Sequence, residues 1–195
     1  MAPKFTRNKE KKIDEILDAV LQLSRTKGAN NFSINDIPEI ANVSIGTIYR
    51  YFPRGKQDIL RHILLRNIEN IKKINETDEI ANSIEEYWAP IIRKMLEVSN
   101  EYDAISDVII EAAPRDSKFY NELASDLMGF YGNMAIQLKK YPNLIDVPVE
   151  KLTLRIGLCF RLLKKVIQAQ QAVALFEKQD LEVYLMKIVK ATFHE

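Results

Sequence analysis

The stretch that decides the fold is residues 42–60, NVSIGTIYRYFPRGKQDIL. Ser44 is a favourable helix N-cap, and Pro53 ends the aromatic helix that follows it. Asn42 tolerates the left-handed backbone conformation in which a preceding helix ends. Only Asn-Val-Ser therefore separates two predicted helices, and so tight a joint is typical of a helix-turn-helix.

Amphipathic helices are predicted on both sides of this joint. Apolar residues recur at helical spacing over residues 8–27, and again over residues 58–74. Ser33 stands three residues before Asp36, which predicts a capping box at the start of the second helix. Pro38 costs little if it lies in the first helical turn, where N–H groups have no partner within the helix, and more if the second helix starts as early as Ser33.

The remainder of the chain has the same helical character, so the predicted fold class is all-α. We expect an N-terminal three-helix domain over residues 1–56 and a larger helical domain over residues 57–195, with helix 57–74 acting as a lever shared by both. Beyond residue 75 we find no internal repeat and no convincing strand. The helices predicted there lie near 82–99, 102–113, 117–140, 149–171 and 180–193.

Composition and motifs argue against several classes of protein. The single cysteine, Cys159, excludes an internal disulfide. No stretch approaches the roughly 18 uninterrupted apolar residues of a membrane span, so we expect a cytoplasmic protein without a membrane partner. Walker, glycine-fingerprint, HExxH and G-x-S-x-G motifs are missing, and His62 and His194 lie far apart. We therefore predict no catalytic residue, no metal site and no cofactor, with a helical enzyme as the alternative.

The charge of the chain is divided unevenly. Residues 1–75 hold 14 Lys/Arg and 8 Asp/Glu, a net charge of +6, whereas residues 76–195 hold 14 and 19, a net charge of −5. Such an asymmetry indicates a basic part that meets a polyanion. A non-specific, architectural nucleic-acid binder is a second alternative, but it would need basic residues over the whole molecule.

The helix after Ser44 carries the groups that a reader of the DNA major groove needs. Ser44 and the helix N-terminus offer donors to a phosphate, Gly46 permits close approach, and Thr47 can touch a thymine methyl or a phosphate. Arg50 can reach a guanine or a phosphate, and the flanking tyrosines can reach the sugar-phosphate backbone. The predicted DNA contacts are Ser33, Ser44, Ile45, Gly46, Thr47, Tyr49, Arg50, Tyr51 and Lys56.

A plainer interpretation of this helix places all three aromatics in the core and leaves Arg50 merely solvated. We expect Ile48 and Phe52, four residues apart, to form the inner face instead. Two tyrosines around one arginine on so short a helix favour a binding role for the outer face.

Residues of about 9–60 resemble the N-terminal domain of the TetR family of transcriptional regulators. The resemblance rests on IDEILDAVLQLSRTKGANNFSINDI (13–37) and ANVSIGTIYRYFPRGKQDIL (41–60). Asn42 stands where the family usually has glycine, and Pro38 where a small helix former is usual. The positions that match the family pattern are Val43, Ser44, Gly46, Thr47, Ile48, Tyr49, Tyr51, Phe52 and Lys56.

The resemblance implies a helix-turn-helix regulator, in most cases a repressor, whose second domain binds a small ligand and forms a homodimer. Helix 149–171 is apolar most of the way round, so it needs burial on two sides, and a partner chain can supply one of them. Two-fold symmetry sets two reading helices about 34 Å apart and predicts a pseudo-palindromic double-stranded DNA operator. The predicted dimer residues are Leu154, Leu158, Arg161, Leu162, Tyr184 and Ile188.

The aromatic stripes between these parts are either packed core or the lining of an effector site. Their Met and aromatic content favours a lipophilic effector, with a fatty acyl-CoA as first candidate. Arg115, Lys139 or Lys140 would meet its phosphates. The predicted effector residues are Trp88, Ile92, Met95, Ile105, Ile109, Tyr120, Leu127, Tyr131 and Met134.

Overall fold

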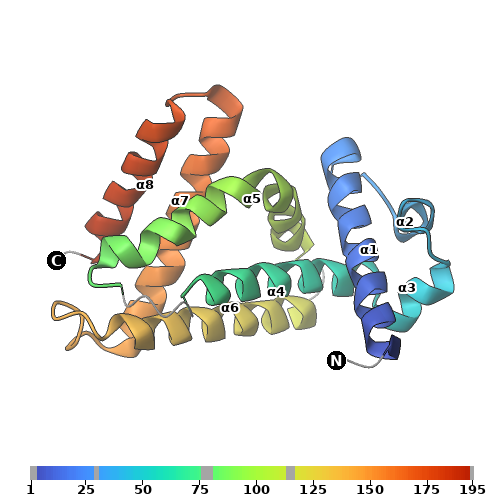
Figure 1. The fold of residues 1–195 in the computed structure, drawn as a ribbon, viewed down its shortest axis with the longest axis horizontal. Coiled ribbons are helices and arrows are strands. Elements are labelled where there is room, and N and C mark those ends of the chain that lie inside the picture. Colours follow the sequence, from blue (N-terminus) through green and yellow to red (C-terminus); the bar gives the residue numbers. More distant parts are fainter. Residues whose placement is uncertain (1–3, 29–30, 76–80, 113–116, 194–195) are drawn as a thin grey trace. The chain divides into compact units, whose positions relative to one another are not determined.

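The protein is described by a computed structural model over residues 4–28, 31–75, 81–112 and 117–193, and the regular structure in these ranges is entirely helical (Figure 1). The predicted all-α fold class is confirmed. None of the described helices is long and apolar enough to cross a membrane. The helices are α1 (Lys4–Lys27), the 3-10 turn η1 (Ile34–Asp36), α2 (Ile37–Ala41), α3 (Ile45–Tyr51), α4 (Lys56–Asn75), α5 (Ile84–Ala112), α6 (Ser117–Leu138), α7 (Val149–Val173) and α8 (Lys178–Phe193).

The chain divides into two compact units. Unit 1 comprises Met1–Asn67 and Asn100–Tyr120, and unit 2 comprises Ile68–Ser99 and Asn121–Glu195. All three divisions fall inside helices, because α4 crosses from unit 1 to unit 2, α5 crosses back and α6 crosses into unit 2 again. The backbone of α4 is therefore continuous from one unit into the other.

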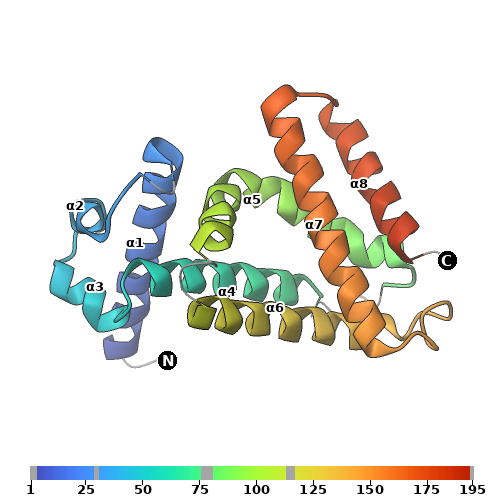
Figure 2. The same cartoon turned by 180° about the vertical axis from the view of Figure 1, so that it is seen from behind.

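Unit 1 is built around one buried face of α1, against which α2 and α3 lie (Figures 1 and 2). Ile16, Val20 and Leu23 of α1 are buried at the predicted helical spacing. From α4, Ile59 and Ile63 are fully buried as well. This core fixes the short helices α2 and α3, which are too short to be stable alone.

The helix boundaries differ from the sequence prediction in one important place. Two helices were expected, near 82–99 and 102–113, but α5 runs unbroken from Ile84 to Ala112, so the break predicted at Asn100 is wrong. Asparagine has only moderately low helix propensity, and a continuing apolar pattern outweighs it. Pro90 also lies within α5.

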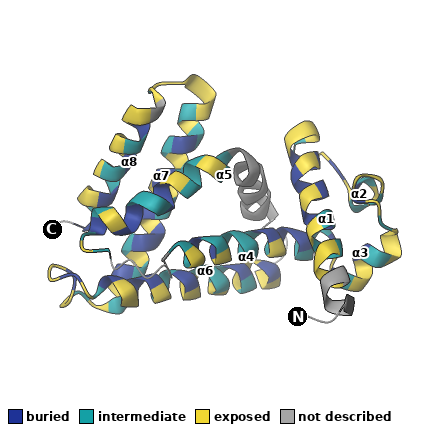
Figure 3. Ribbon diagram, viewed as in Figure 1, coloured by how far each residue is buried: buried dark blue, intermediate teal, exposed yellow. Residues whose placement is uncertain are grey.

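Unit 2 is centred on the pair α7 and α8, which run side by side in opposite directions (Figures 1 and 2). Leu152, Ile156 and Cys159 of α7 are fully buried, as are Leu185 and Val189 of α8. Along both helices buried and exposed residues alternate with the helical turn (Figure 3). Each helix therefore buries one stripe and leaves the other in water.

The turn between α7 and α8 is fixed by one side chain. The Gln170 amide accepts from the Phe176 N–H at 2.8 Å and donates to the Phe176 carbonyl at 2.6 Å. Ala174 ends α7 with a φ of 48°, in the left-handed region that glycine usually occupies. Ion pairs tie α8 to α5, with Lys190 to Glu85 at 2.8 Å. The α7–α8 hairpin is thus held at its tip and along its length.

Candidate nucleic-acid interface

The joint between α2 and α3 has the geometry that the sequence predicts. Asn42 adopts φ 50° and ψ 48°, and its N–H donates to the Pro38 carbonyl, which ends α2. The Ser44 hydroxyl oxygen accepts from the Thr47 N–H at 3.1 Å and caps α3. It also shares a 2.9 Å hydrogen bond with the Thr47 hydroxyl. Because α2 begins only at Ile37, Pro38 lies in its first turn, where it costs little.

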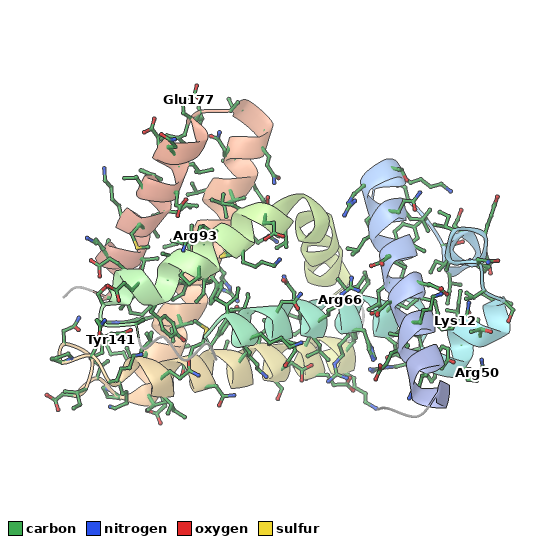
Figure 4. The ribbon with its side chains drawn as sticks, viewed as in Figure 1. Lys12, Arg50, Arg66, Arg93, Tyr141 and Glu177 are labelled. Atoms are coloured by element: carbon green, nitrogen blue, oxygen red, sulfur yellow. The ribbon has the colours of Figure 1, made fainter. Side chains whose placement is uncertain are left out.

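Helix α3 has one inner and one outer face. Ile48 and the adjoining Phe52 are fully buried, which confirms their predicted inward packing. Tyr49 is 47% exposed, and Arg50 is exposed at the right-hand edge of Figure 4. Because Tyr49 faces water, the interpretation that all three aromatics are core is wrong.

The outer face of α3 consists of Ile45, Gly46, Tyr49 and Arg50, all of them exposed. At 100° per residue these four positions span a single arc of the helix, with Gly46 and Tyr49 at its centre. The Arg50 guanidinium lies 5.1 Å from the centre of the neighbouring Tyr51 ring. At this distance the guanidinium is within range of a cation–π interaction with the ring.

The capping box at the start of η1 is confirmed, and it occupies the hydroxyl of Ser33. The Ser33 oxygen accepts from the Asn35 N–H at 3.3 Å, and the Asp36 carboxylate accepts from the Ser33 N–H at 2.7 Å. Lys27 donates to the same carboxylate at 2.7 Å. The Lys27 ammonium, helped by the bonds from Ser33, holds the pKa of Asp36 far below its ordinary value.

Lys56 lies against unit 1's own backbone. Its ammonium donates to the Phe32 carbonyl at 2.9 Å and stands 3.8 Å from the centre of the Phe32 ring. Burial lowers the pKa of Lys56. The side chain therefore braces the start of α4 against the segment before η1, and its contact with a phosphate stays a prediction.

One ion pair within unit 1 is not predicted by any local pattern in the sequence. Arg66 of α4 donates to Asp18 of α1 at 3.3 Å and lies 3.6 Å from Asp14 (Figure 4). The partners are 48 residues apart in the chain, so no local pattern indicates them. This ion pair joins α4 to the helix on which α2 and α3 rest.

Two of the predicted effector residues, Trp88 and Tyr131, belong to an aromatic cluster in unit 2. Trp88 lies 5.1 Å from Phe160 between ring centres, and Tyr131 stacks on Phe160 at 5.5 Å. Trp88, Ile92 and Met134 are buried, whereas Met95, Leu127 and Tyr131 are half-buried. Phe160, which contacts Trp88, Phe130 and Tyr131, was not among the predicted site residues, because its position in the sequence groups it with the second apolar side of helix 149–171.

Three of the predicted effector residues lie apart from this cluster or cannot be placed. Tyr120 belongs to unit 1 and is exposed. The side chains of Ile105 and Ile109 lie outside the described residues, as does Arg115. Lys139 donates to the Val147 carbonyl at 3.0 Å, and Lys140 lies 5.2 Å from the Tyr141 ring centre.

The predicted dimer residues lie on the outer stripe of α7 and α8. Leu154, Leu158 and Leu162 are exposed by 66%, 54% and 43%, at a spacing of four residues. Arg161 and Tyr184 are exposed beside them, and Ile188 is half-buried. The inner stripe of α7 is buried in its own unit, so the two apolar sides predicted for this helix are both present.

Comparisons with known proteins agree with this geometry. Residues 16–63 match the family model described as bacterial regulatory proteins, tetR family. No curated protein matches this sequence significantly.

Among solved structures, a transcriptional regulator from Rhodococcus sp. Rha1 is 14% identical, with a TM-score of 0.70 over 92% of this chain and 95% of its own. A protein of Syntrophomonas wolfei assigned to the TetR-family transcriptional regulators is 23% identical, with a TM-score of 0.69 over 94% and 95%. The fatty acid degradation regulator FadR of Bacillus halodurans is 17% identical, with a TM-score of 0.66 over 93% and 97%.

A capped short helix with an outward polar and aromatic face, held by a three-helix core, defines a helix-turn-helix DNA-binding domain. Residues 16–63 are thus similar to the tetR family of bacterial regulatory proteins, and more than nine-tenths of the chain shares the fold of the solved regulators named above.

Proposed function

We propose that this chain is a ligand-responsive transcriptional repressor that binds a pseudo-palindromic operator as a homodimer and is released by a lipophilic small molecule. The observation that carries the proposal is the outer face of α3, where Gly46, Tyr49 and Arg50 face water on a helix anchored by Ile48 and Phe52. The residues of 1–75 carry a net charge of +6, which suits a polyanionic partner.

Selection from a random pool of duplexes tests specific binding. A specific regulator prefers its selected duplex over random DNA by on the order of 10³ or more at one salt concentration. An architectural DNA-binding protein would show nearly equal affinities for both. Failure to enrich or bind any duplex would reject the proposed function.

The outer stripe of α7 supports the homodimer. Leu154, Leu158 and Leu162 line one face of α7 and would lower the solubility of a monomer, whereas a second copy of the chain would bury them. We expect Leu158→Glu to yield a folded monomer with strongly reduced operator affinity, because both half-sites must be held together. Ile136→Glu is the matched control: Ile136, on α6, is 62% exposed and outside the predicted interface. Sedimentation measures the mass, and an unchanged dimer in Leu158→Glu would refute the assignment.

The aromatic cluster supports an apolar effector in unit 2. The Trp88 indole N–H is buried and has no hydrogen-bond acceptor among the described residues. A buried donor without a partner is uncommon, and an acceptor atom of a ligand would satisfy it. The solved relative from Bacillus halodurans is named a fatty acid degradation regulator, which keeps a fatty acyl-CoA as our first candidate.

Trp88 is the chain's single tryptophan, so its fluorescence reports on unit 2 without DNA. Palmitoyl-CoA, below its micelle concentration, should change the emission and lower the affinity for the selected duplex. Coenzyme A and palmitate are the control ligands. If saturating palmitoyl-CoA changes neither signal, acyl-CoA is rejected as effector, while the DNA-binding proposal is unaffected.

The coupling we propose runs through α4, whose backbone is continuous between the units. A ligand that displaces the later part of α4 would move its earlier part, to which Arg66 ties α1. Such a shift releases DNA only if the ligand prefers the non-binding conformation.

A further inference from the structure

Ile45 is an exposed apolar side chain at a position where isoleucine contributes little to the stability of the fold. It is the first residue of α3 and is 39% exposed on the outer face of that helix. Acidic and polar residues are the ones favoured in a first helical turn, and a β-branched side chain contributes little to helix stability. A single exposed isoleucine is ordinary on a protein surface, but this one lies on the same arc as Gly46, Tyr49 and Arg50.

We infer that Ile45 reads the C5 methyl group of a thymine in each operator half-site, an inference that rests on the proposed DNA-binding function. Among the base edges of the major groove, the thymine methyl is the apolar group that an aliphatic side chain can contact. The N-terminal residues of a recognition helix are the ones that reach base edges. The neighbours of Ile45 on the outer face, a phenol and a guanidinium, suit a groove lined by phosphates.

The structure favours Ile45 over Thr47 for this role. The Thr47 hydroxyl is held by Ser44 at 2.9 Å, its N–H is used in the cap, and its side chain is only half-exposed. At 100° per residue, Thr47 lies on the far side of Gly46 from Ile45 and at the edge of the outer face. Thr47 therefore serves the cap of α3, and the apolar contact falls to Ile45.

The test replaces thymine by deoxyuridine, which removes only the C5 methyl group. A duplex selected with the full-length wild-type chain is resynthesised with one thymine at a time changed to deoxyuridine in one half-site. Burial of one methyl group corresponds to about fourfold in affinity. We expect one position per half-site to show this loss, and about fifteenfold when both related positions are changed.

The same duplexes are then measured with Ile45→Ala and Ile40→Ala. Ile40, on α2, is also 39% exposed and is the matched control. We expect Ile45→Ala to bind the thymine and deoxyuridine duplexes equally, because the side chain that senses the methyl is gone. Ile40→Ala should keep the fourfold ratio, even if its overall affinity falls.

Two results would overturn the inference. If no deoxyuridine position weakens wild-type binding, no thymine methyl is read. If Ile45→Ala keeps the fourfold ratio, another residue reads it. Both results presuppose a bound duplex, so they differ from failure of the proposed function, in which no duplex is bound at all. Thermal unfolding of each variant confirms that it is folded.

Discussion

Replacing Gly46 by alanine separates what α3 needs for folding from what it needs for DNA. An ideal Cβ at Gly46 would meet only the Ser44 hydroxyl oxygen, at 3.8 Å, which is ordinary contact. The positive φ values among the described glycines belong to Gly28 and Gly55, so Gly46 has a backbone conformation that alanine adopts freely. Nothing in the described part of the protein requires glycine here.

Gly46→Ala should have opposite effects on folding stability and on DNA affinity. Alanine exceeds glycine in helix propensity by up to about 1 kcal/mol in a helix interior, and by less near the N-terminus of a short helix. Gly46→Ala should therefore raise the unfolding free energy by roughly 0.3–1 kcal/mol and the Tm by about 1–3 °C. On DNA, the added methyl stands at the centre of the outer face and keeps the backbone from close approach. We expect affinity to fall by at least about tenfold, or ~1.4 kcal/mol.

Fluorescence anisotropy with a selected duplex, at one fixed salt concentration, measures the affinity, and thermal unfolding measures the stability. Gly129→Ala is the matched control. Gly129 lies within α6, and a Cβ there would meet nothing within 4 Å. The control should gain a similar increment of stability and bind DNA as the wild type does.

Two outcomes would refute the reasoning. Wild-type DNA affinity in Gly46→Ala would mean that the α3 backbone does not approach the DNA closely. A loss of stability in Gly46→Ala would mean that the space around Gly46 is not open in the free protein.

Three further substitutions and one chemical probe test other residues. Arg50→Ala should cost roughly 1–3 kcal/mol of binding free energy and relax the sequence preference, whereas Tyr49→Phe should weaken binding to all duplexes about equally. Selection of duplexes with each variant tests this difference. Equal losses of affinity across all duplexes in both variants would refute base reading by Arg50. Lys56→Ala should lower the unfolding free energy by about 1–3 kcal/mol in urea, because the Phe32 carbonyl loses its donor; unchanged stability would refute the brace. Burial raises the pKa of Cys159 to about 12, so the native thiol should react slowly with a thiol reagent at pH 8 and quickly in urea. The pKa of the thiol in the unfolded chain is about 8.5, so above that pH only the unfolded chain loses the proton, and the free energy of unfolding should fall as the pH rises.

Local signals in the sequence predicted the DNA-binding part well. Ser44, Asn42 and Pro38 each act on the backbone within a few residues, through a cap, a left-handed turn and a first-turn position, so their effects can be derived without the fold. The brace from Lys56 to Phe32 spans 24 residues and the tie from Arg66 to Asp18 spans 48. Contacts of this kind depend on how the helices pack, and no periodicity indicates them.

In α7 the spacing of apolar residues does not by itself predict which face of the helix is buried. Its two apolar stripes have similar spacing, so periodicity alone could not say which one enters the core of unit 2. The structure buries the stripe of Leu152, Ile156 and Leu163 and exposes Leu154 and Leu158. The polar neighbours distinguish the two stripes, because the outer one is flanked by exposed cations and the inner one is not.

The exposed leucines of α7 need a physical explanation, because they do not stabilise an isolated chain. A monomer gains no stability from Leu154, Leu158 and Leu162 in water, and lysine or glutamate would serve helix formation there equally well. Burial of a leucine side chain is worth about 1.5–3 kcal/mol relative to exposure, so three of them in each of two chains represent a large unrealised stabilisation. In the proposed homodimer a second copy of the chain would realise this stabilisation, with the same residues on both sides. The exposed apolar stripe of α7 is therefore the physical reason for the homodimer that we propose.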